Sequence, residues 1–203
     1  MKFFSLENPI WKFIGNLADF FLLSCLWYLC CLPVVTAGGA ATTALYYVTL
    51  KMARGQEGQL IPAFFHSFKQ NLKQATALWV GYLAVGILLV LDLVICLQTS
   101  SVFAGAMFFT SVVLLACWAL FITMLFPLVA RCDNTIGALF KMGIAMALRN
   151  VMPVLAALMV TVAFFAVGVF VFWPVLLVAP GLASYCNAFL FNRIFDKYGM
   201  TLE

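Results

Sequence analysis

Long apolar runs separated by short polar connections dominate the chain. A helix needs about 20 mainly apolar residues to cross the hydrocarbon core of a bilayer. Five runs meet this requirement, and they cover residues 13–32, 75–97, 102–129, 150–172 and 174–192. Because irregular backbone and open sheet edges leave polar groups unsatisfied in lipid, each run is expected to be a helix. The pattern therefore predicts an all-α fold, a polytopic integral membrane helix bundle.

The segment at residues 34–50 has no charge, but small residues and hydroxyl groups lower its hydropathy. Pro33 precedes it, at a position where a helix can begin without losing a hydrogen bond. Gly39 and Thr43 are small residues four apart, a spacing that lets helix backbones approach closely and predicts a helix buried in the bundle. Hydropathy alone leaves two alternatives open, a further span or a re-entrant hairpin.

The positions of the basic residues favour a further span. They form four clusters: Lys2 and Lys12; Lys51, Arg54, Lys69 and Lys73; Arg131, Lys141 and Arg149; Arg193 and Lys197. Short loops that carry Lys and Arg stay on the cytoplasmic side, and the intervening connections here are neutral. All the clusters lie on one side only if residues 34–50 cross the bilayer. We therefore predict a single transmembrane domain over residues 1–203, multi-pass in the cell membrane, with about six spans and both termini cytoplasmic.

Two connections on the predicted cytoplasmic side have amphipathic patterns. In the first, the apolar face holds Ile61, Phe64, Phe65, Phe68 and Leu72, and the polar face holds His66, Lys69, Gln70 and Lys73. This helix is expected either to lie in the lipid interface or to dock on a partner. The second, residues 136–150, resembles the first at a fixed offset, with Phe64 matching Phe140 and Lys73 matching Arg149. The match allows a parallel repeat of the kind found in transport proteins.

Composition strengthens the membrane assignment and narrows the function. Of the 203 residues, 66% are hydrophobic and 9% are charged, and the mean hydropathy is +1.12, so the chain has too little polar surface for a soluble domain. The net charge of +4 is too small to indicate a nucleic-acid-binding protein. The seven cysteines lack histidine partners at metal-ligand spacing, so no metal and no cofactor is expected.

A small set of polar residues near or inside the predicted spans forms the candidate functional positions. Asn16 and Asp19 lie in the first span, Thr36 lies in the second, and Arg149 lies at the cytoplasmic end of the fifth. Ionisable residues in a span indicate a pathway or an ion pair by default. The candidate partners of the Asp19 carboxylate are Lys12, Arg149 and Arg193. Asp92 lies near the outer end of its span, close to water. No HExxH, GxSxG or phosphate-loop motif is present, which argues against an enzyme.

Several short motifs are distributed along the chain: Gly15-Asn16, Leu32-Pro33-Val34-Val35-Thr36-Ala37-Gly38, Ala44-Leu45-Tyr46-Tyr47, Lys51-Met52-Ala53-Arg54-Gly55, Phe64-Phe65-His66-Ser67-Phe68-Lys69 and Asn192-Arg193-Ile194-Phe195-Asp196-Lys197-Tyr198. Together they resemble the YesL-like bacterial membrane family, a domain of unknown function, over essentially the whole chain. The motif residues Pro33, Thr36 and Gly38 are the most specific for this family. At the position of Gly39, many relatives have a residue other than glycine. The resemblance implies a setting beside carbohydrate ABC importers and sensor kinases, and it carries no catalytic residue.

Two functions are expected from these observations. The first is a non-enzymatic accessory or regulatory membrane protein in carbohydrate ABC uptake or its sensing. Its expected partner or interface contacts are Phe64, Phe65, Phe68, Lys69 and Lys73. The alternative is a small homo-oligomeric transporter or channel for a small solute, favoured by the repeat and by Asp19. Membrane lipid is an expected partner in both cases, and a purely structural, lipid-interacting scaffold is a third interpretation.

Overall fold

The computed structural model describes residues 9–32, 34–56, 58–99 and 102–200. Every regular element in these ranges is a helix, which confirms the predicted all-α fold. The elements in chain order are α1 (Pro9–Cys30), α2 (Val34–Met52), α3 (Leu60–Gln98), α4 (Val102–Val129), α5 (Ile136–Arg149), α6 (Val151–Phe170), the short 3₁₀ helix η1 (Trp173–Leu177) and α7 (Ala179–Lys197).

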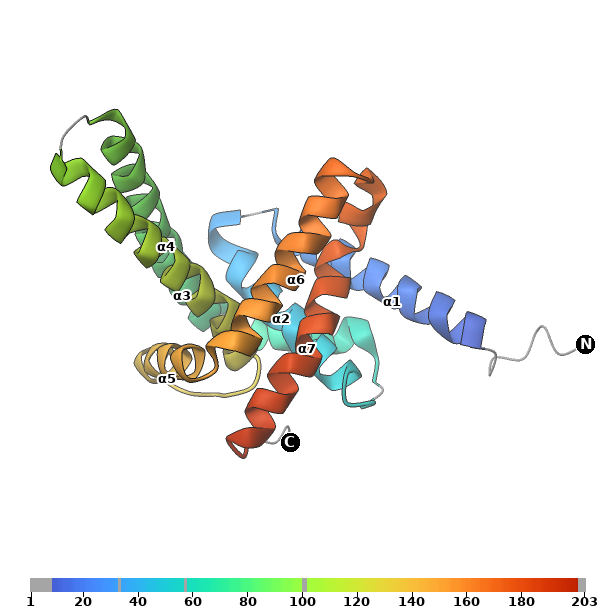
Figure 1. Ribbon diagram of the computed structural model, residues 1–203. Helices are drawn as coiled ribbons and strands as arrows, with labels where there is room; N and C mark the ends of the chain where they lie inside the picture. The colour runs from blue at the N-terminus through green and yellow to red at the C-terminus, as the bar shows by residue number, and fades with distance from the viewer. Residues whose placement is uncertain (1–8, 33, 57, 100–101, 201–203) are drawn as a thin grey trace, which may run out of the picture.

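The bundle is built around α2, which contacts α1, α3, α4 and α7 (Figure 1). α3 and α4 form a long antiparallel hairpin, and α6 and α7 form a second pair. The adjoining ends of α3 and α4, together with η1, lie at the upper end of the molecule in Figure 1, whereas α5 lies nearer the lower end. We call the end that holds α5, the α2–α3 connection and the last described residues the basic end.

Small side chains allow α2 to occupy the centre. Ala40, Ala41 and Ala44 are fully buried, at 0% exposure. Thr43 and Thr49 are buried as well, and their hydroxyl groups donate to carbonyl oxygens of their own helix at 2.9 Å and 3.0 Å. These bonds satisfy the hydroxyl groups without a polar partner on another helix. The structure thus confirms that the helix at residues 34–50 is buried in the bundle.

Three helices are long and apolar enough to cross a membrane, namely α3, the Gly105–Val129 part of α4, and α6. The chain is therefore a membrane protein. α1 contributes a shorter apolar stretch at Leu17–Cys30, and α2 is one continuous helix of 19 residues. A count of about six spans remains a prediction, and the continuity of α2 fits a crossing better than a hairpin that turns back within the segment.

The first amphipathic segment is not a separate helix. The sequence predicts a helix at residues 61–73 followed by a span at 75–97, but the structure has the single helix α3, which is 39 residues long. No glycine or proline lies between Lys73 and Trp79, so nothing in the sequence ends the helix there.

The last helix begins later than the predicted span at 174–192. Trp173–Leu177 forms the 3₁₀ helix η1, and α7 begins at Ala179 and runs to Lys197. Pro174 and Pro180 each lie in the first turn of their helix, where the missing N–H group costs no helical hydrogen bond. The two prolines therefore mark two helix starts where the hydropathy pattern indicated one.

The two amphipathic segments do not form matching units. Phe64 is 0% exposed, whereas Phe140, its counterpart in the proposed repeat, is 47% exposed. In addition, α3 continues straight into a span, whereas α5 ends at Arg149 and the chain turns at Asn150. The match reflects the apolar periodicity that amphipathic helices share, and the structure does not support a parallel repeat.

Topology reporters that are active only outside the cell test the predicted orientation. A reporter fused after Gln98, in the α3–α4 turn, is expected to be active, because this connection carries no basic residue. Fusions after Gln56 and Asn134, which lie in basic connections, are expected to be inactive. Activity at Gln56 would show that α2 does not cross the membrane.

Candidate functional site

Three segments that are distant in the sequence meet at the basic end. Arg54 follows α2, Arg131 lies between α4 and α5, and Asp196 lies near the end of α7. Gly55 and Gly199, which follow α2 and α7, have φ values of +68° and +69°. This left-handed conformation suits glycine and reverses the chain at a helix end. The two turns place the residues that follow each helix against the α4–α5 connection.

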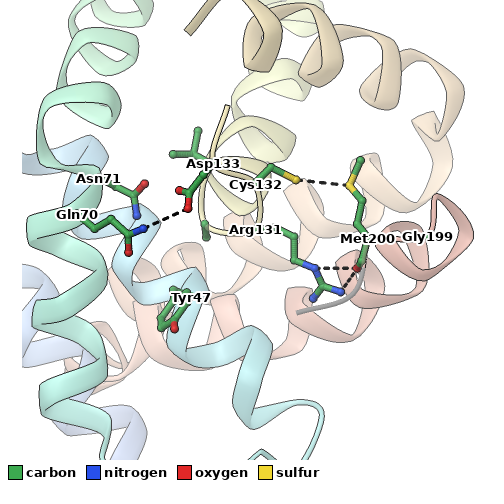
Figure 2. A pocket seen from close by; sticks show the side chains of 10 residues that line it. Tyr47, Gln70, Asn71, Arg131, Cys132, Asp133, Gly199 and Met200 are labelled. Atoms are coloured by element: carbon green, nitrogen blue, oxygen red, sulfur yellow. Dashed lines mark hydrogen bonds between the residues drawn. The ribbon is translucent and has the colours of Figure 1, made fainter. Parts of the chain in front are cut away.

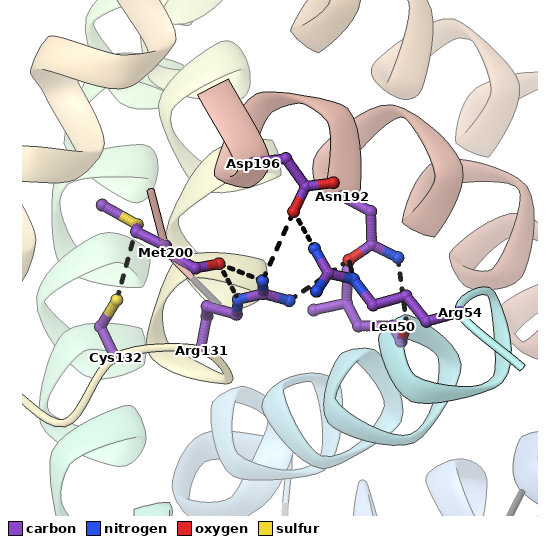
Figure 3. A network of polar contacts seen from close by, with 7 residues as sticks. All are labelled: Leu50, Arg54, Arg131, Cys132, Asn192, Asp196 and Met200. Atoms are coloured by element: carbon purple, nitrogen blue, oxygen red, sulfur yellow. Dashed lines mark hydrogen bonds and ion pairs between the residues drawn. The ribbon is translucent and has the colours of Figure 1, made fainter. Parts of the chain in front are cut away.

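A polar network joins the three segments (Figure 3). Arg54 forms an ion pair with Asp196, and Arg131 Nη2 lies 3.9 Å from the same carboxylate oxygen. Asn192 Oδ1 accepts hydrogen bonds from Arg54 Nε at 3.0 Å and from Arg131 Nη1 at 3.3 Å. Asn192 Nδ2 donates to the Leu50 carbonyl oxygen at 3.1 Å. One carboxylate thus serves two arginines, and a neutral amide supplies a further acceptor to both.

Arg131 is the central member of this network. Its side chain is 0% exposed, whereas that of Asp196 is 57% exposed. Arg131 Nε donates to the Met200 carbonyl oxygen at 3.0 Å, and the guanidinium carbon lies 5.3 Å from the centroid of the Phe195 ring. Burial and the nearby Arg54 charge lower the pKa of Arg131, and Asp196 raises it. Because the ordinary arginine pKa is so high, the group keeps its charge at neutral pH.

A cavity of about 440 Å³ opens beside the network (Figure 2). Gln70 Nε2 donates to Asp133 Oδ2 at 3.3 Å in its wall, and Cys132 Sγ lies 3.7 Å from Met200 Sδ. Burial raises the pKa of the Cys132 thiol, although the Arg131 charge opposes the shift. A thiol that stays protonated at neutral pH is a poor nucleophile. The groups that line this cavity are therefore suited to hydrogen bonding and to holding segments together.

Within the described part of the chain, no group of three or more His, Cys, Asp or Glu residues is placed to hold a metal ion. Two carboxylates at this end, Asp196 and Asp133, are already engaged by Arg54 and Gln70 respectively.

The predicted contact residues on α3 divide between the core and the surface. Phe64 is fully buried among α1 and α2 side chains, and Phe65 and Phe68 are half-buried against the same cluster. Lys69 and Lys73 are exposed. The aromatic residues thus hold α3 to the bundle, and the lysines are the part of the predicted contact set that a partner can reach.

The exposed side of this part of α3 is basic. His66, Lys69 and Lys73 are exposed, and their spacing places them on one side of the helix. We call these three residues the basic face. Beside it, Gln70 donates to Asp133 and Gln74 donates to the Asn134 carbonyl oxygen. The α4–α5 connection therefore fixes this part of α3, and the basic face has a defined orientation on a rigid helix.

The candidate polar positions in and near the spans are dispersed. Asp19 lines a second cavity of about 470 Å³ together with Met52 and Tyr185. The ion pairs among the described residues both involve Asp196, so the expected pairing of Asp19 with Arg149 or Arg193 is not seen there. Arg149 is exposed at the end of α5.

Some of the predicted positions lie outside the described residues. Pro33 is one of them, and the side chains of Asn16, Thr36 and Lys12 are also outside the description, although their backbone is helical. Of the motif residues, Gly38 is described. A Cβ atom at Gly38 would lie 3.1 Å from the Trp79 indole ring, so this glycine permits a close contact between α2 and α3.

Sequence reasoning missed the polar network itself. Arg131 was seen only as a topology signal, and Asn192 and Asp196 only as parts of a motif. Asp92, which the sequence places close to water, is half-buried and accepts a hydrogen bond from Ser111 of α4. The available signal is the clustering of polar residues near helix ends, which indicates their positions along the chain but not their partners.

Comparison with known proteins finds a family match for one part of the chain. Residues 20–93 match the model of a family described as "Protein of unknown function, DUF624". The match extends from α1 through α2 into the span of α3, so it includes Arg54 and the basic face. No curated protein and no solved structure gives a significant match.

Proposed function

We propose that this protein is a non-enzymatic accessory or regulatory membrane protein that acts by binding a partner at the basic face of α3. The proposed partner is a subunit of a carbohydrate ABC importer or its sensor kinase, in keeping with the YesL-like resemblance. In this proposal the protein lies in the plasma membrane with both termini in the cytoplasm.

This proposal rests on the basic face, which is exposed and lies on a helix that is held in place. Lys69 and Lys73 extend into solvent from a helix whose opposite side is buried and whose flank is bonded to the α4–α5 connection. No carboxylate pairs with these lysines among the described ion pairs. A fixed basic surface complements an acidic surface on another protein and steers its approach.

The polar groups inside the bundle support binding rather than transport. Thr42, Thr43 and Thr161 donate to carbonyl oxygens of their own helices at 2.8 Å, 2.9 Å and 3.0 Å. Hydroxyl groups that donate in this way do not need water as an acceptor. A solute path needs polar groups that are free to exchange water for the solute.

One observation favours the alternative of a small homo-oligomeric transporter or channel. Asn187 is fully buried in α7, and its Nδ2 donates to Thr161 Oγ1 at 2.9 Å, but its Oδ1 atom has no hydrogen-bond partner. A buried amide oxygen without a partner is costly and usually contacts water or a ligand. The transporter alternative predicts that Asn187 lies on the solute path.

Site-specific crosslinking in native membranes tests the binding proposal. A photoreactive residue at Lys69 is expected to capture one membrane or peripheral protein. Lys73→Glu in the same chain is expected to reduce the capture at least fivefold, because it reverses the charge of the remaining lysine of the basic face and weakens the encounter. The captured protein is identified by mass spectrometry. A photoreactive residue at Lys197, exposed at the end of α7, is the matched control and is expected to give little of the same product.

Two outcomes would contradict the proposal. Equal capture from Lys69 and Lys197 would show that the basic face is not the contact surface. Substrate-specific sugar flux through the purified protein in liposomes, abolished by Asn187→Leu, would instead establish the transporter alternative.

A further inference from the structure

Two apolar grooves flank α4 where α5 crosses it. Each has a volume of about 360 Å³. The first lies on the α3 side and includes Tyr82, Ile136 and Phe140, and the second lies on the α6 side and includes Ile144, Leu148 and Val151. Trp118 and Phe121 of α4 line both grooves. The grooves therefore lie side by side and share one wall.

The shared wall is a ridge of aromatic rings. The Phe121 and Phe140 rings meet edge to face with centroids 4.8 Å apart. The Trp118 ring stacks on Tyr82 at 3.9 Å, and Trp118 Nε1 donates to the Tyr82 carbonyl oxygen at 3.2 Å. The indole N–H group is thus satisfied within the protein, and the ring surfaces of the ridge can contact apolar chains on both sides.

The exposed side of α5 carries a stripe of apolar residues. Ile136, Phe140, Ile144 and Leu148 recur every four residues and are 37–66% exposed, so they form one stripe beside the buried face of the helix. Residues of this stripe line both grooves together with residues from the middle of α4, a helix that is long and apolar enough to span a membrane. The stripe is therefore continuous with the surface of a candidate membrane span, which favours acyl chains over an aqueous partner as its contacts.

A basic residue, Lys141, lies next to this stripe. Lys141 follows Phe140, is exposed, and lies on the edge of α5 just beyond the stripe. A helix that presents an apolar stripe to the acyl chains and a lysine at its edge places the ammonium group at the level of the lipid headgroups. Basic positions between membrane helices on the cytoplasmic side bind anionic headgroups.

We propose that α4 and α5 form a binding site for one anionic diacyl phospholipid. One acyl chain lies in each groove, the Trp118 and Phe121 rings separate the two chains, and the headgroup phosphate contacts Lys141. The positive charge of Lys141 favours an anionic lipid over a zwitterionic one, because the headgroup of the zwitterionic lipid also carries a cation, which offsets the attraction of the phosphate. This site is separate from the basic face of α3, so it does not depend on the proposed function.

Native mass spectrometry of the full chain in mild detergent tests the headgroup. The protein is titrated with dioleoyl phosphatidylglycerol or dioleoyl phosphatidylcholine, which have identical acyl chains. We expect phosphatidylglycerol to bind about fivefold more tightly, the effect of one lysine at an anionic lipid surface. Lys141→Gln is expected to abolish this preference, whereas Lys197→Gln, a change of the same kind at the exposed end of α7, is expected to retain it. Equal binding of the two lipids, or an equal loss of the preference in both variants, would overturn the proposal.

Tryptophan quenching by phosphatidylglycerol with brominated acyl chains tests the grooves. The bromine atoms quench only indole rings that the chains contact, so the fluorescence quenched in the wild-type protein is expected to fall in Trp118→Phe. Ile144→Asn, which adds a polar group to the second groove, is expected to weaken binding of both lipids, whereas Ile61→Asn on α3 is not. An unchanged quenched fraction in Trp118→Phe would show that the chains lie elsewhere and would overturn the proposal.

Discussion

Arg131→Ala is expected to lower the free energy of unfolding by about 3 kcal/mol, the cost of breaking a buried, hydrogen-bonded charge network. The guanidinium is 0% exposed and donates to Asn192 Oδ1 and the Met200 carbonyl oxygen. Its removal leaves the Met200 carbonyl oxygen without this donor and leaves Asn192 Oδ1 with Arg54 alone. The α4–α5 connection and the chain after α7 then lose their link. Unfolding in mixed detergent micelles, followed by circular dichroism, measures the change.

Two variants separate charge from geometry at Arg131. Arg131→Lys keeps the positive charge but not the planar set of donors, so it is expected to recover less than half of the lost stability. Arg193→Ala removes an exposed arginine from the same end of α7 and is expected to change stability by less than about 0.5 kcal/mol. Similar losses in Arg131→Ala and Arg193→Ala would show that the network does not stabilise the fold.

The sequence predicts the helices of this protein well because lipid imposes a simple rule on them. The run at residues 102–129 corresponds to α4 at Val102–Val129, and the segment at 34–50 corresponds to α2 at Val34–Met52. A backbone in lipid must satisfy its hydrogen bonds internally, so a long apolar run has few alternatives to a helix. The errors lie where proline or its absence decides a boundary, at Pro180 and at the junction within α3.

The faces of the helices are predicted less well. The apolar pattern shows that Phe64 and Phe140 each lie on an apolar side, but a membrane protein has two apolar surroundings, its own core and the lipid. Phe64 is buried in the core, whereas Phe140 borders the grooves beside α4. Periodicity alone does not distinguish these environments.

The polar network is beyond sequence reasoning for a related reason. Arg54 and Arg131 follow helices, and Asn192 and Asp196 lie in the last turns of α7. Any of these four side chains would be solvated on its helix in isolation. Their contact depends on how α2, α4 and α7 cross, and the crossing depends on where small residues allow close approach. Glycine positions in α2 are therefore the link between the sequence and the site.

Gly39→Ala is expected to lower the free energy of unfolding by about 2 kcal/mol, within the range for overpacking a close contact. A Cβ atom at this position would lie 2.5 Å from the Ala75 carbonyl oxygen and 2.7 Å from Trp79 Cβ, both on α3. The first neighbour is backbone and cannot rotate away, so α2 and α3 must separate. Because Arg54 follows α2, the same movement is expected to displace it from Asn192 and Asp196. Thermal unfolding in detergent measures the stability, and crosslinking from Lys69 reports the position of the basic face.

Gly81→Ala is the matched control for Gly39→Ala. Gly81 lies in α3, where an added Cβ atom meets no atom within 4 Å, and alanine is the better helix former. The control is therefore expected to leave stability unchanged or to raise it by up to about 0.5 kcal/mol. Larger residues at position 39 should be worse than alanine, because each added carbon must enter the same contact between α2 and α3. If Gly39→Ala and Gly39→Leu both unfold like Gly81→Ala, the two helices are not in close contact, and the arrangement that brings Arg54 to α7 must have another cause.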